Sequence, residues 1–166
     1  MLEGNIISFT AVRLDHGWLG NMSPHPVEAL STTWPTCEHL FQSLRFAGHK
    51  DAQEGIRNIK SPMAAKMYAK GRRSLMTVEP MSDQDLANMR FVLRAKVEQH
   101  ASLAVELSMT TGYTLIEDVT KRPHGSGLFW GMMRDTTATD THGWRGKNML
   151  GNLWMELRDA RERGGL

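Results

Sequence analysis

Apolar residues recur at helical spacing in several segments of the chain, and prolines, glycines and short polar residues separate these segments. One segment has apolar residues at the i, i+3, i+4, i+7 spacing of a buried helix face: Cys37, Leu40, Phe41 and Leu44. Thr36 is a suitable N-cap for this helix, because Pro35 before it cannot continue one. Glu38, Gln42 and Arg45 form a neighbouring polar stripe on the same predicted helix.

Other segments predict further helices. Ser61-Pro62 starts one, with serine as the cap and proline at the first helical position. Pro80 and Ser82 introduce the longest helix, and residues 103–109 have the pattern of a short one. Apolar residues expected to face inward in the longest helix and in the last helix are Leu86, Met89, Leu93, Val97, Leu150, Leu153, Trp154 and Leu157.

Strand formers are few. The segments 6–9 and 113–117 read as short strands. Breakers between residues 17 and 26 predict a loop, and residues 118–147 form the longest irregular stretch. With no repeat and no linker, the expectation is one domain over residues 1–166, an α+β fold that is mainly α-helical.

Composition narrows the class of protein. The 166 residues carry 20 Lys+Arg and 18 Asp+Glu, a net charge of +2 that argues against a dedicated duplex-DNA binder. No apolar run suits a membrane span, and the N-terminus lacks the pattern of a signal peptide. The single cysteine cannot form an internal disulfide. We therefore expect a cytoplasmic protein, or one in the host cytoplasm if it is viral, with no membrane partner.

Two clusters of residues could carry chemistry. In Cys37-Glu38-His39 the side chains point about 100° apart on a helix, so they cannot meet at one substrate atom. Cys37 is expected to be an inert core residue. Glu38 at the helix start is either a functional carboxylate, favoured by the helix dipole, or a capping or solvated side chain.

The second cluster joins Trp130-Gly131 to Gly146-Lys147-Asn148. Glycine allows close backbone approach, lysine can meet phosphate, and an aromatic face can stack on a base. The alternative is a turn and an Asn cap before the last helix, which needs no ligand. A basic set is either a solvated face or a phosphate-binding surface: Lys66, Lys70, Arg72 and Arg73.

Together these segments resemble the NADAR family, in particular its YbiA-like N-glycosidases. The resemblance runs from about Ile6 to Arg161. The matching motifs, in chain order, are Trp34-Pro35-Thr36-Cys37-Glu38-His39, Phe41-Gln42, Ser61-Pro62-Met63, Leu93-Arg94-Ala95-Lys96, Glu98-Gln99-His100, Leu115-Ile116-Glu117, Trp130-Gly131, Gly146-Lys147-Asn148, Leu150-Gly151, Met155-Glu156 and Arg158. Several ordered motifs are far more specific than any one of them.

The resemblance implies hydrolysis of N-glycosidic bonds, either in early riboflavin intermediates or between ADP-ribose and guanine, without a metal or redox cofactor. It implies catalytic roles for Glu38, Trp130 and Asn148. Residues expected to bind substrate are Asn21, Arg45, Lys66, Gly131 and Lys147. The expected partner is a small phosphorylated nucleoside-type substrate, or ADP-ribosylated nucleic acid.

Three positions depart from the family pattern. Arg45 stands where the family usually has a lysine, and an arginine stays protonated and cannot attack the sugar as an amine. Met81 replaces a tryptophan, and Gly127 replaces an aspartate. These departures motivate an alternative function, a catalytically weakened module that binds ADP-ribose or NAD. Lys66 is the candidate to replace the missing family lysine.

Overall fold

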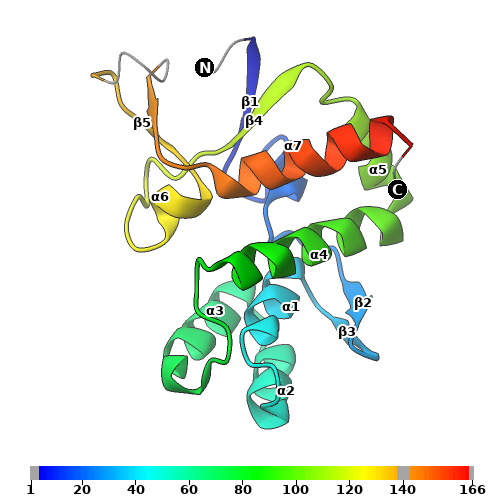
Figure 1. The fold of residues 1–166 in the computed structure, drawn as a ribbon, viewed down its shortest axis with the longest axis vertical. Helices are drawn as coiled ribbons and strands as arrows, with labels where there is room; N and C mark the ends of the chain where they lie inside the picture. The colour runs from blue at the N-terminus through cyan, green and yellow to red at the C-terminus, as the bar shows by residue number, and fades with distance from the viewer. Residues whose placement is uncertain (1–3, 138–142, 165–166) are drawn as a thin grey trace. The chain divides into compact units, whose positions relative to one another are not determined.

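The structure, a computed structural model, describes residues 4–137 and 143–164 of the chain. Within these ranges it holds seven α-helices, two short 3-10 helices and six short strands (Figure 1). The strands pair only two by two, so no extended sheet is present in the described residues. The prediction of a mainly helical α+β fold is confirmed.

The contacts within the chain define two compact units. The first unit comprises Met1–Gly20 and Ala104–Leu166, and the second comprises Asn21–Leu103. The expectation of a single domain over residues 1–166 stays a prediction.

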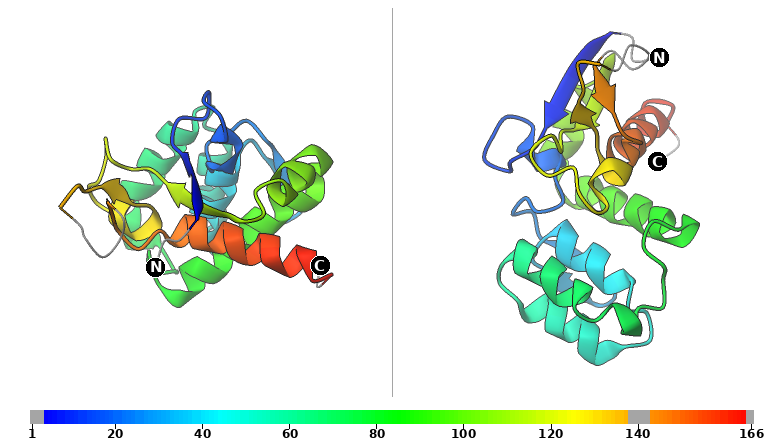
Figure 2. Two further views of the ribbon diagram at one scale, coloured as in Figure 1. Left: turned by 90° about the horizontal axis from the view of Figure 1, so that it is seen from above. Right: turned by 90° about the vertical axis from the view of Figure 1, so that its left-hand side faces the viewer.

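The second unit is a cluster of four helices with one hairpin (Figure 2). Its elements are β2 (Val27–Ala29), β3 (Thr32–Trp34), α1 (Cys37–Leu44), α2 (Lys50–Asn58), α3 (Pro62–Lys70), η2 (Arg73–Leu75) and α4 (Asp83–Gln99). Helix α1 packs against α2, α3 and α4, so it occupies the middle of this unit. That position places the residues of the Glu-His motif inside the unit rather than on its surface.

Helix starts in this unit follow the predicted caps. The hydroxyl of Thr36 accepts a hydrogen bond from the backbone N–H of His39. Ser61 caps α3 with Pro62 at the first helical position, and Ser82 caps α4. These serine and threonine caps satisfy backbone donors that have no partner within their helix, and all three predictions are confirmed.

Two elements of this unit were not predicted. Helix α2 has a polar sequence whose buried residues are Ala52 and Ile56, and they join Phe46, Ala65 and Ala69 in one apolar cluster. The hairpin β2–β3 turns through a two-residue loop, Leu30 and Ser31, with φ of 53° and 61°. Both residues are left-handed, as a type I′ turn requires. Neither residue type signals such a turn.

The first unit is built around β4 (Tyr113–Glu117), which pairs in parallel with β1 (Asn5–Phe9). Both strands are predicted nearly to the residue. The other elements are η1 (Gly17–Leu19), α5 (Ala101–Ser108, which begins in the second unit), α6 (Gly127–Trp130), β5 (Met133–Arg134), β6 (Trp144–Arg145) and α7 (Met149–Glu162). Helix α7 packs along β4, and Figure 1 shows the two elements side by side.

The stretch 118–147 is less irregular than predicted, because it holds α6 and the small hairpin β5–β6. Residues 138–142 of that stretch lie outside the described residues. Most predicted inward residues are buried, but Leu44, Leu86 and Leu157 keep part of their surface exposed. None of the helices in the described part of the chain is both long and apolar enough to span a lipid bilayer.

Candidate active site

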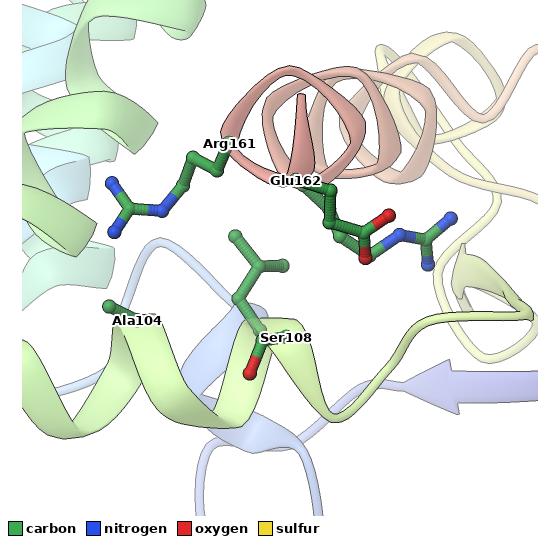
Figure 3. A pocket seen from close by; sticks show the side chains of 6 residues that line it. Ala104, Ser108, Arg161 and Glu162 are labelled. Atoms are coloured by element: carbon green, nitrogen blue, oxygen red, sulfur yellow. The ribbon is translucent and has the colours of Figure 1, made fainter. Parts of the chain in front are cut away.

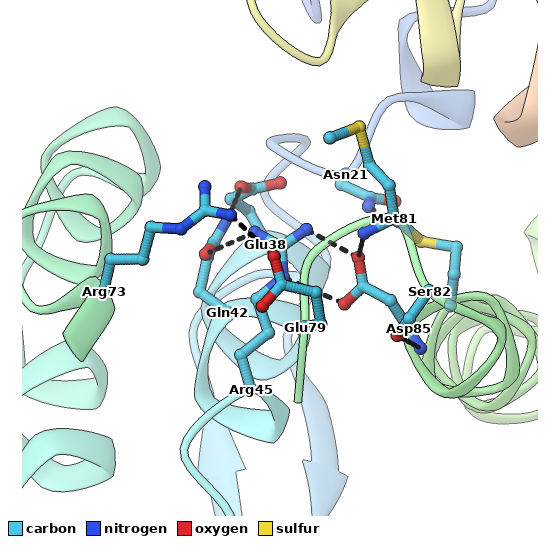
Figure 4. A network of polar contacts seen from close by, with 10 residues as sticks. Asn21, Glu38, Gln42, Arg45, Arg73, Glu79, Met81, Ser82 and Asp85 are labelled. Atoms are coloured by element: carbon cyan, nitrogen blue, oxygen red, sulfur yellow. Dashed lines mark hydrogen bonds and ion pairs between the residues drawn. The ribbon is translucent and has the colours of Figure 1, made fainter. Parts of the chain in front are cut away.

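Glu38 lies in the first turn of α1 and is only 7% exposed. Its Oε1 accepts a hydrogen bond of 2.8 Å from Nε2 of Gln42, one turn further along the helix (Figure 4). Its backbone N–H donates to the carbonyl oxygen of Asn21 at 2.9 Å. The interpretation of Glu38 as a solvated side chain is therefore wrong, because a carboxylate this buried must be held by protein groups.

Arg45 continues the same polar stripe and is buried as well. Its guanidinium binds Asp85 through two nitrogens, with Nε–Oδ1 at 2.9 Å and Nη2–Oδ2 at 2.7 Å. Its Nη1 donates to Oε1 of Gln42 at 3.3 Å. The stripe therefore forms one chain of contacts inside the second unit, from Asp85 through Arg45 and Gln42 to Glu38.

This chain of contacts fixes the carboxylate of Glu38. The bidentate ion pair is a rigid geometry for a guanidinium, so Arg45 presents Nη1 to Gln42 in one orientation. Gln42 accepts from Arg45 with its oxygen and donates to Glu38 with its nitrogen. A hydrogen-bonded amide between a cation and an anion is polarised by both. The N-terminus of α1 adds a favourable dipole at Glu38.

Gln42 belongs to the polar stripe that the sequence predicts, because it lies four residues after Glu38 on one helix face. Asp85 is the member of this cluster that no sequence pattern indicates. It is 40 residues from Arg45, and its position follows from the packing of α4 against α1. Asp85 also accepts the backbone N–H of Met81, which has a positive φ of 65°.

Asn21 belongs to the same unit and is buried. Its amide nitrogen donates to the sulfur of Met89 at 3.2 Å. Its amide oxygen is buried and has no hydrogen-bond partner in the described residues. Asn21, Glu38 and Arg45 are therefore all buried in the second unit.

The side chains that flank Glu38 are structural. Cys37 is fully buried, and burial raises the pKa of its thiol to about 11, so it stays protonated near neutral pH. Both ring nitrogens of His39 are engaged, Nδ1 with Oγ1 of Thr36 and Nε2 with the carbonyl oxygen of Ile59. These two contacts confirm that Cys37, Glu38 and His39 do not converge on one reacting atom.

A buried lysine lies in the same unit and was noted in the sequence only as part of a motif. Lys96 is fully buried on α4, and its Nζ donates to Oγ of Ser23 at 2.7 Å. Burial lowers the pKa of its ammonium to about 8. The ring of His25 contacts the same hydroxyl through Nδ1 at 2.9 Å, so Ser23 links the two titratable groups.

Trp130, Gly131, Lys147 and Asn148 come together in the first unit, as their motifs predict. The backbone N–H of Asn148 donates to the carbonyl oxygen of Gly131 at 3.2 Å. Trp130 is mostly buried and meets Phe129 edge to face, with ring centroids 4.9 Å apart. Lys147 is exposed, with its Nζ 5.5 Å from the centre of the Phe129 ring.

Asn148 occupies the N-cap position of α7, but its side chain does not cap the helix. Instead Oδ1 accepts from the backbone N–H of Glu117 at 3.2 Å, and Nδ2 donates to the carbonyl oxygen of Leu115 at 2.8 Å. Its backbone is left-handed, with φ of 53°. Asn148 therefore joins the start of α7 to β4 through both ends of its amide.

Glycines in these motifs allow backbones to approach closely. A Cβ at Gly131 would lie 2.5 Å from the carbonyl oxygen of Glu117, and one at Gly151 would lie 2.1 Å from that of Leu115. Neither distance is compatible with a side chain. A Cβ at Gly127, where the family usually has an aspartate, would lie 2.7 Å from the carbonyl oxygen of Arg122. The local backbone is thus adapted to glycine there.

All four residues of the basic set are exposed, and the hydrogen bonds that link Asp85 to Glu38 include none of them. Lys66 is exposed on α3, and its side chain makes no hydrogen bond or ion pair with any described residue. Arg72 stacks on the ring of Tyr68, 3.4 Å from its centre. Arg73 forms an exposed ion pair with Glu79 at 2.8 Å (Figure 4). Two of these four cations are thus held by local partners.

A hollow of about 200 Å³ lies in the first unit (Figure 3). Its lining residues are Ala104, Leu107, Ser108, Arg158, Arg161 and Glu162. Arg158 is engaged there by the carbonyl oxygens of Thr110 and Tyr113. No predicted site residue lines this hollow. Among the described residues, no group of three or more His, Cys, Asp or Glu side chains is placed to hold a metal ion.

Comparison with known proteins supports the motif-based resemblance. Residues 8–160 match the NADAR domain. The chain is 35% identical over 159 residues to N-glycosidase YbiA of Shigella flexneri serotype 5b (strain 8401), covering 96% of this chain and 90% of that protein. It is 31% identical over 169 residues to the chloroplastic riboflavin biosynthesis protein PYRR of Zea mays, covering 94% of this chain and 25% of that protein.

A solved structure agrees with these sequence matches. The NMR structure of the E. coli protein YbiA matches with a TM-score of 0.77 at 34% identity, covering 99% of this chain and 89% of that chain. The family match spans nearly the whole chain, and the identity to N-glycosidase YbiA of Shigella flexneri is 35% over 90% of that protein. On sequence and on fold alike, the chain belongs to the NADAR family.

Proposed function

We propose that this protein is an N-glycosidase that hydrolyses the bond between a base or amine nitrogen and C1′ of a phosphorylated ribose. The substrate classes are a ribosylamine phosphate like the early riboflavin intermediates and an ADP-ribosyl group. The observation that carries the proposal is the buried carboxylate of Glu38, held by Gln42 at the N-terminus of α1. The names of the relatives, N-glycosidase and riboflavin biosynthesis protein, support the reaction class.

Glu38 would act on the anomeric carbon. Breaking the N–C1′ bond builds positive charge on the sugar ring, and a fixed carboxylate beside C1′ stabilises that charge. Glu38 then accepts a proton from the attacking water while the water oxygen bonds to C1′. The electron pair of the broken bond stays on the leaving nitrogen, which takes up a proton. The products are a free sugar hemiacetal and the free amine or base.

Arg45 would act as a positioning residue in this reaction. Its guanidinium is occupied by Asp85 and Gln42, and it stays protonated. The substrate phosphate would then be held by other cations, for which Lys147 and Lys66 remain the proposals. From the family resemblance we also propose that Trp130 contacts the base or the ribose, that the backbone at Gly131 lies close to the substrate, and that Asn148 forms a hydrogen bond with the substrate.

The test is product analysis by mass spectrometry with three substrates: the ribosylaminopyrimidine phosphate, NAD, and an oligonucleotide carrying ADP-ribosylated guanine. Glu38→Gln is the decisive variant, because glutamine can still accept the hydrogen bond from Gln42 but cannot take a proton from water. We expect its turnover to fall by about 10²- to 10⁴-fold with binding retained. The matched control is Glu79→Gln, an exposed carboxylate, and it should turn over normally.

Near-normal turnover by Glu38→Gln would remove Glu38 from the catalytic role. A second candidate function is a nucleotide-binding module without turnover, favoured by the replacement of the family lysine with Arg45 in an ion pair. It predicts micromolar binding to one of the three substrates and no product over hours. Release of ADP-ribose from the oligonucleotide alone would identify modified nucleic acid as the substrate.

A further inference from the structure

The amide oxygen of Asn21 is a hydrogen-bond acceptor that finds no donor in the part of the chain that the structure describes. The residue is 8% exposed, and Oδ1 is fully buried with no partner in the described residues. Its orientation follows from its other contact, because Nδ2 faces the sulfur of Met89. A thioether sulfur can accept a hydrogen bond but has no proton to donate. Turning the amide over would set its oxygen against the sulfur, so the nitrogen belongs there.

This acceptor is joined directly to the Glu38 segment. The backbone carbonyl of Asn21 accepts the N–H of Glu38 at 2.9 Å, so the two residues keep a fixed separation. Figure 4 draws Asn21 together with the residues of the polar network. An unpaired acceptor in a buried place is costly and calls for an explanation. A donor supplied by the substrate would satisfy it.

We infer that Asn21 determines sugar specificity: its Oδ1 accepts a hydrogen bond from the ribose 2′-hydroxyl, so the site requires a ribosyl and not a 2-deoxyribosyl group. This inference rests on the proposed function, in which Glu38 lies beside C1′. The 2′-hydroxyl is carried by C2′, the carbon bonded to C1′, so it is the nearest sugar donor to a group adjoining Glu38. Hydrogen bonds to the hydroxyl at this position strengthen as a glycosidic bond breaks.

An amine on the base is the competing source of a donor. The base leaves during the reaction and differs between the two substrate classes, whereas the ribose is common to both. An acceptor held to the Glu38 backbone suits the sugar, which stays in place while water attacks. The hydroxyl is therefore the assignment that fits both substrate classes.

The test compares two enzymes and two substrates. The enzymes are wild type and Asn21→Leu, which keeps the branched shape and removes the oxygen. The substrates are the ribosylaminopyrimidine phosphate and its 2′-deoxy analogue. We expect the analogue to lower the kcat/KM of wild type by about 10- to 100-fold, because a buried acceptor would lose its donor. In Asn21→Leu the two substrates should differ by less than about threefold.

Asn88→Leu, which changes an asparagine on α4 that accepts a hydrogen bond from Gln84, is the control and should keep the full discrimination. Circular dichroism and thermal melting check that each variant folds, and Asn21→Ser replaces Asn21→Leu if the latter does not. Undiminished discrimination in the Asn21 variant overturns the inference. A second comparison uses a substrate whose base lacks its amino group. If the Asn21 variant no longer distinguishes this substrate from the normal one but still distinguishes ribose from 2-deoxyribose, the donor belongs to the base, and the inference is overturned.

Failure of the proposed function is recognised separately. If wild type turns over neither substrate, calorimetry with ribose 5-phosphate and 2-deoxyribose 5-phosphate replaces the kinetic comparison. Tighter binding of the ribose compound by wild type but not by the Asn21 variant supports the inference without the glycosidase activity. Equal binding of the two compounds, or binding of neither, overturns it.

Discussion

Replacing Asp85 with alanine isolates the buried ion pair behind Glu38. Asp85 is fully buried, and its carboxylate accepts two hydrogen bonds from Arg45 and one from the backbone of Met81. Asp85→Ala removes all three acceptor contacts at once. It leaves the guanidinium of Arg45, which is 10% exposed at the side chain, without its counter-charge.

The magnitude follows from that uncompensated charge. Removing one partner of a buried ion pair destabilises a protein by about 3–5 kcal/mol, because the remaining charge stays desolvated. A domain is stable by about 5–15 kcal/mol in total. For a chain of this length, about 1 kcal/mol corresponds to about 2–4 °C in melting temperature. We therefore expect Asp85→Ala to lower the melting temperature by about 6–20 °C.

Urea unfolding followed by circular dichroism measures this change through the midpoint at constant slope. The control is Glu79→Ala, which breaks the exposed pair with Arg73 and should change the free energy of unfolding by less than about 0.5 kcal/mol. The double variant Arg45→Met/Asp85→Leu should lose less stability than the two single changes added together, because it leaves neither member of the ion pair as an unpaired buried charge. A loss below about 1 kcal/mol for Asp85→Ala would refute the reasoning.

Two further predictions concern stability. Gly151→Ala should destabilise the protein by about 1–3 kcal/mol in urea unfolding, because the added Cβ would lie 2.1 Å from the carbonyl oxygen of Leu115. A change from glycine to alanine within a helix otherwise stabilises a protein. A stabilised variant would therefore show that the backbone at Gly151 does not approach Leu115 this closely. Lys96 has a folded pKa of about 8, below the ordinary 10.5, so the unfolded chain binds more protons between these values. The free energy of unfolding of wild type, relative to Lys96→Met, should therefore rise with pH by about 3 kcal/mol from pH 8 to 10.5. A stability difference between wild type and Lys96→Met that does not change with pH would contradict this prediction. The control is Lys70→Met, at an exposed helix position, for which the stability difference from wild type should not change with pH.

Local hydrogen bonds could be predicted from the sequence. The caps at Thr36, Ser61 and Ser82 each bond a backbone N–H three residues away, so the sequence itself contains both partners. The strand 113–117 is marked by its flanking residues and its β-forming composition. The family motifs are also local in sequence, so they indicate the NADAR fold without any tertiary contact.

The burial and the hydrogen-bond partners of the polar residues are determined only by the tertiary structure. The stripe of Glu38, Gln42 and Arg45 is a pattern of one helix, and the packing of α4 turns it into a buried network by bringing Asp85 to Arg45. The amide of Asn148 is committed to strand β4, more than 30 residues earlier in the chain. The amide oxygen of Asn21 has no donor among the described residues because of how the elements pack around it, and no local sequence pattern encodes that. Sequence spacing predicts contacts within a turn or two of chain, whereas burial and pairing over long separations depend on how the elements pack.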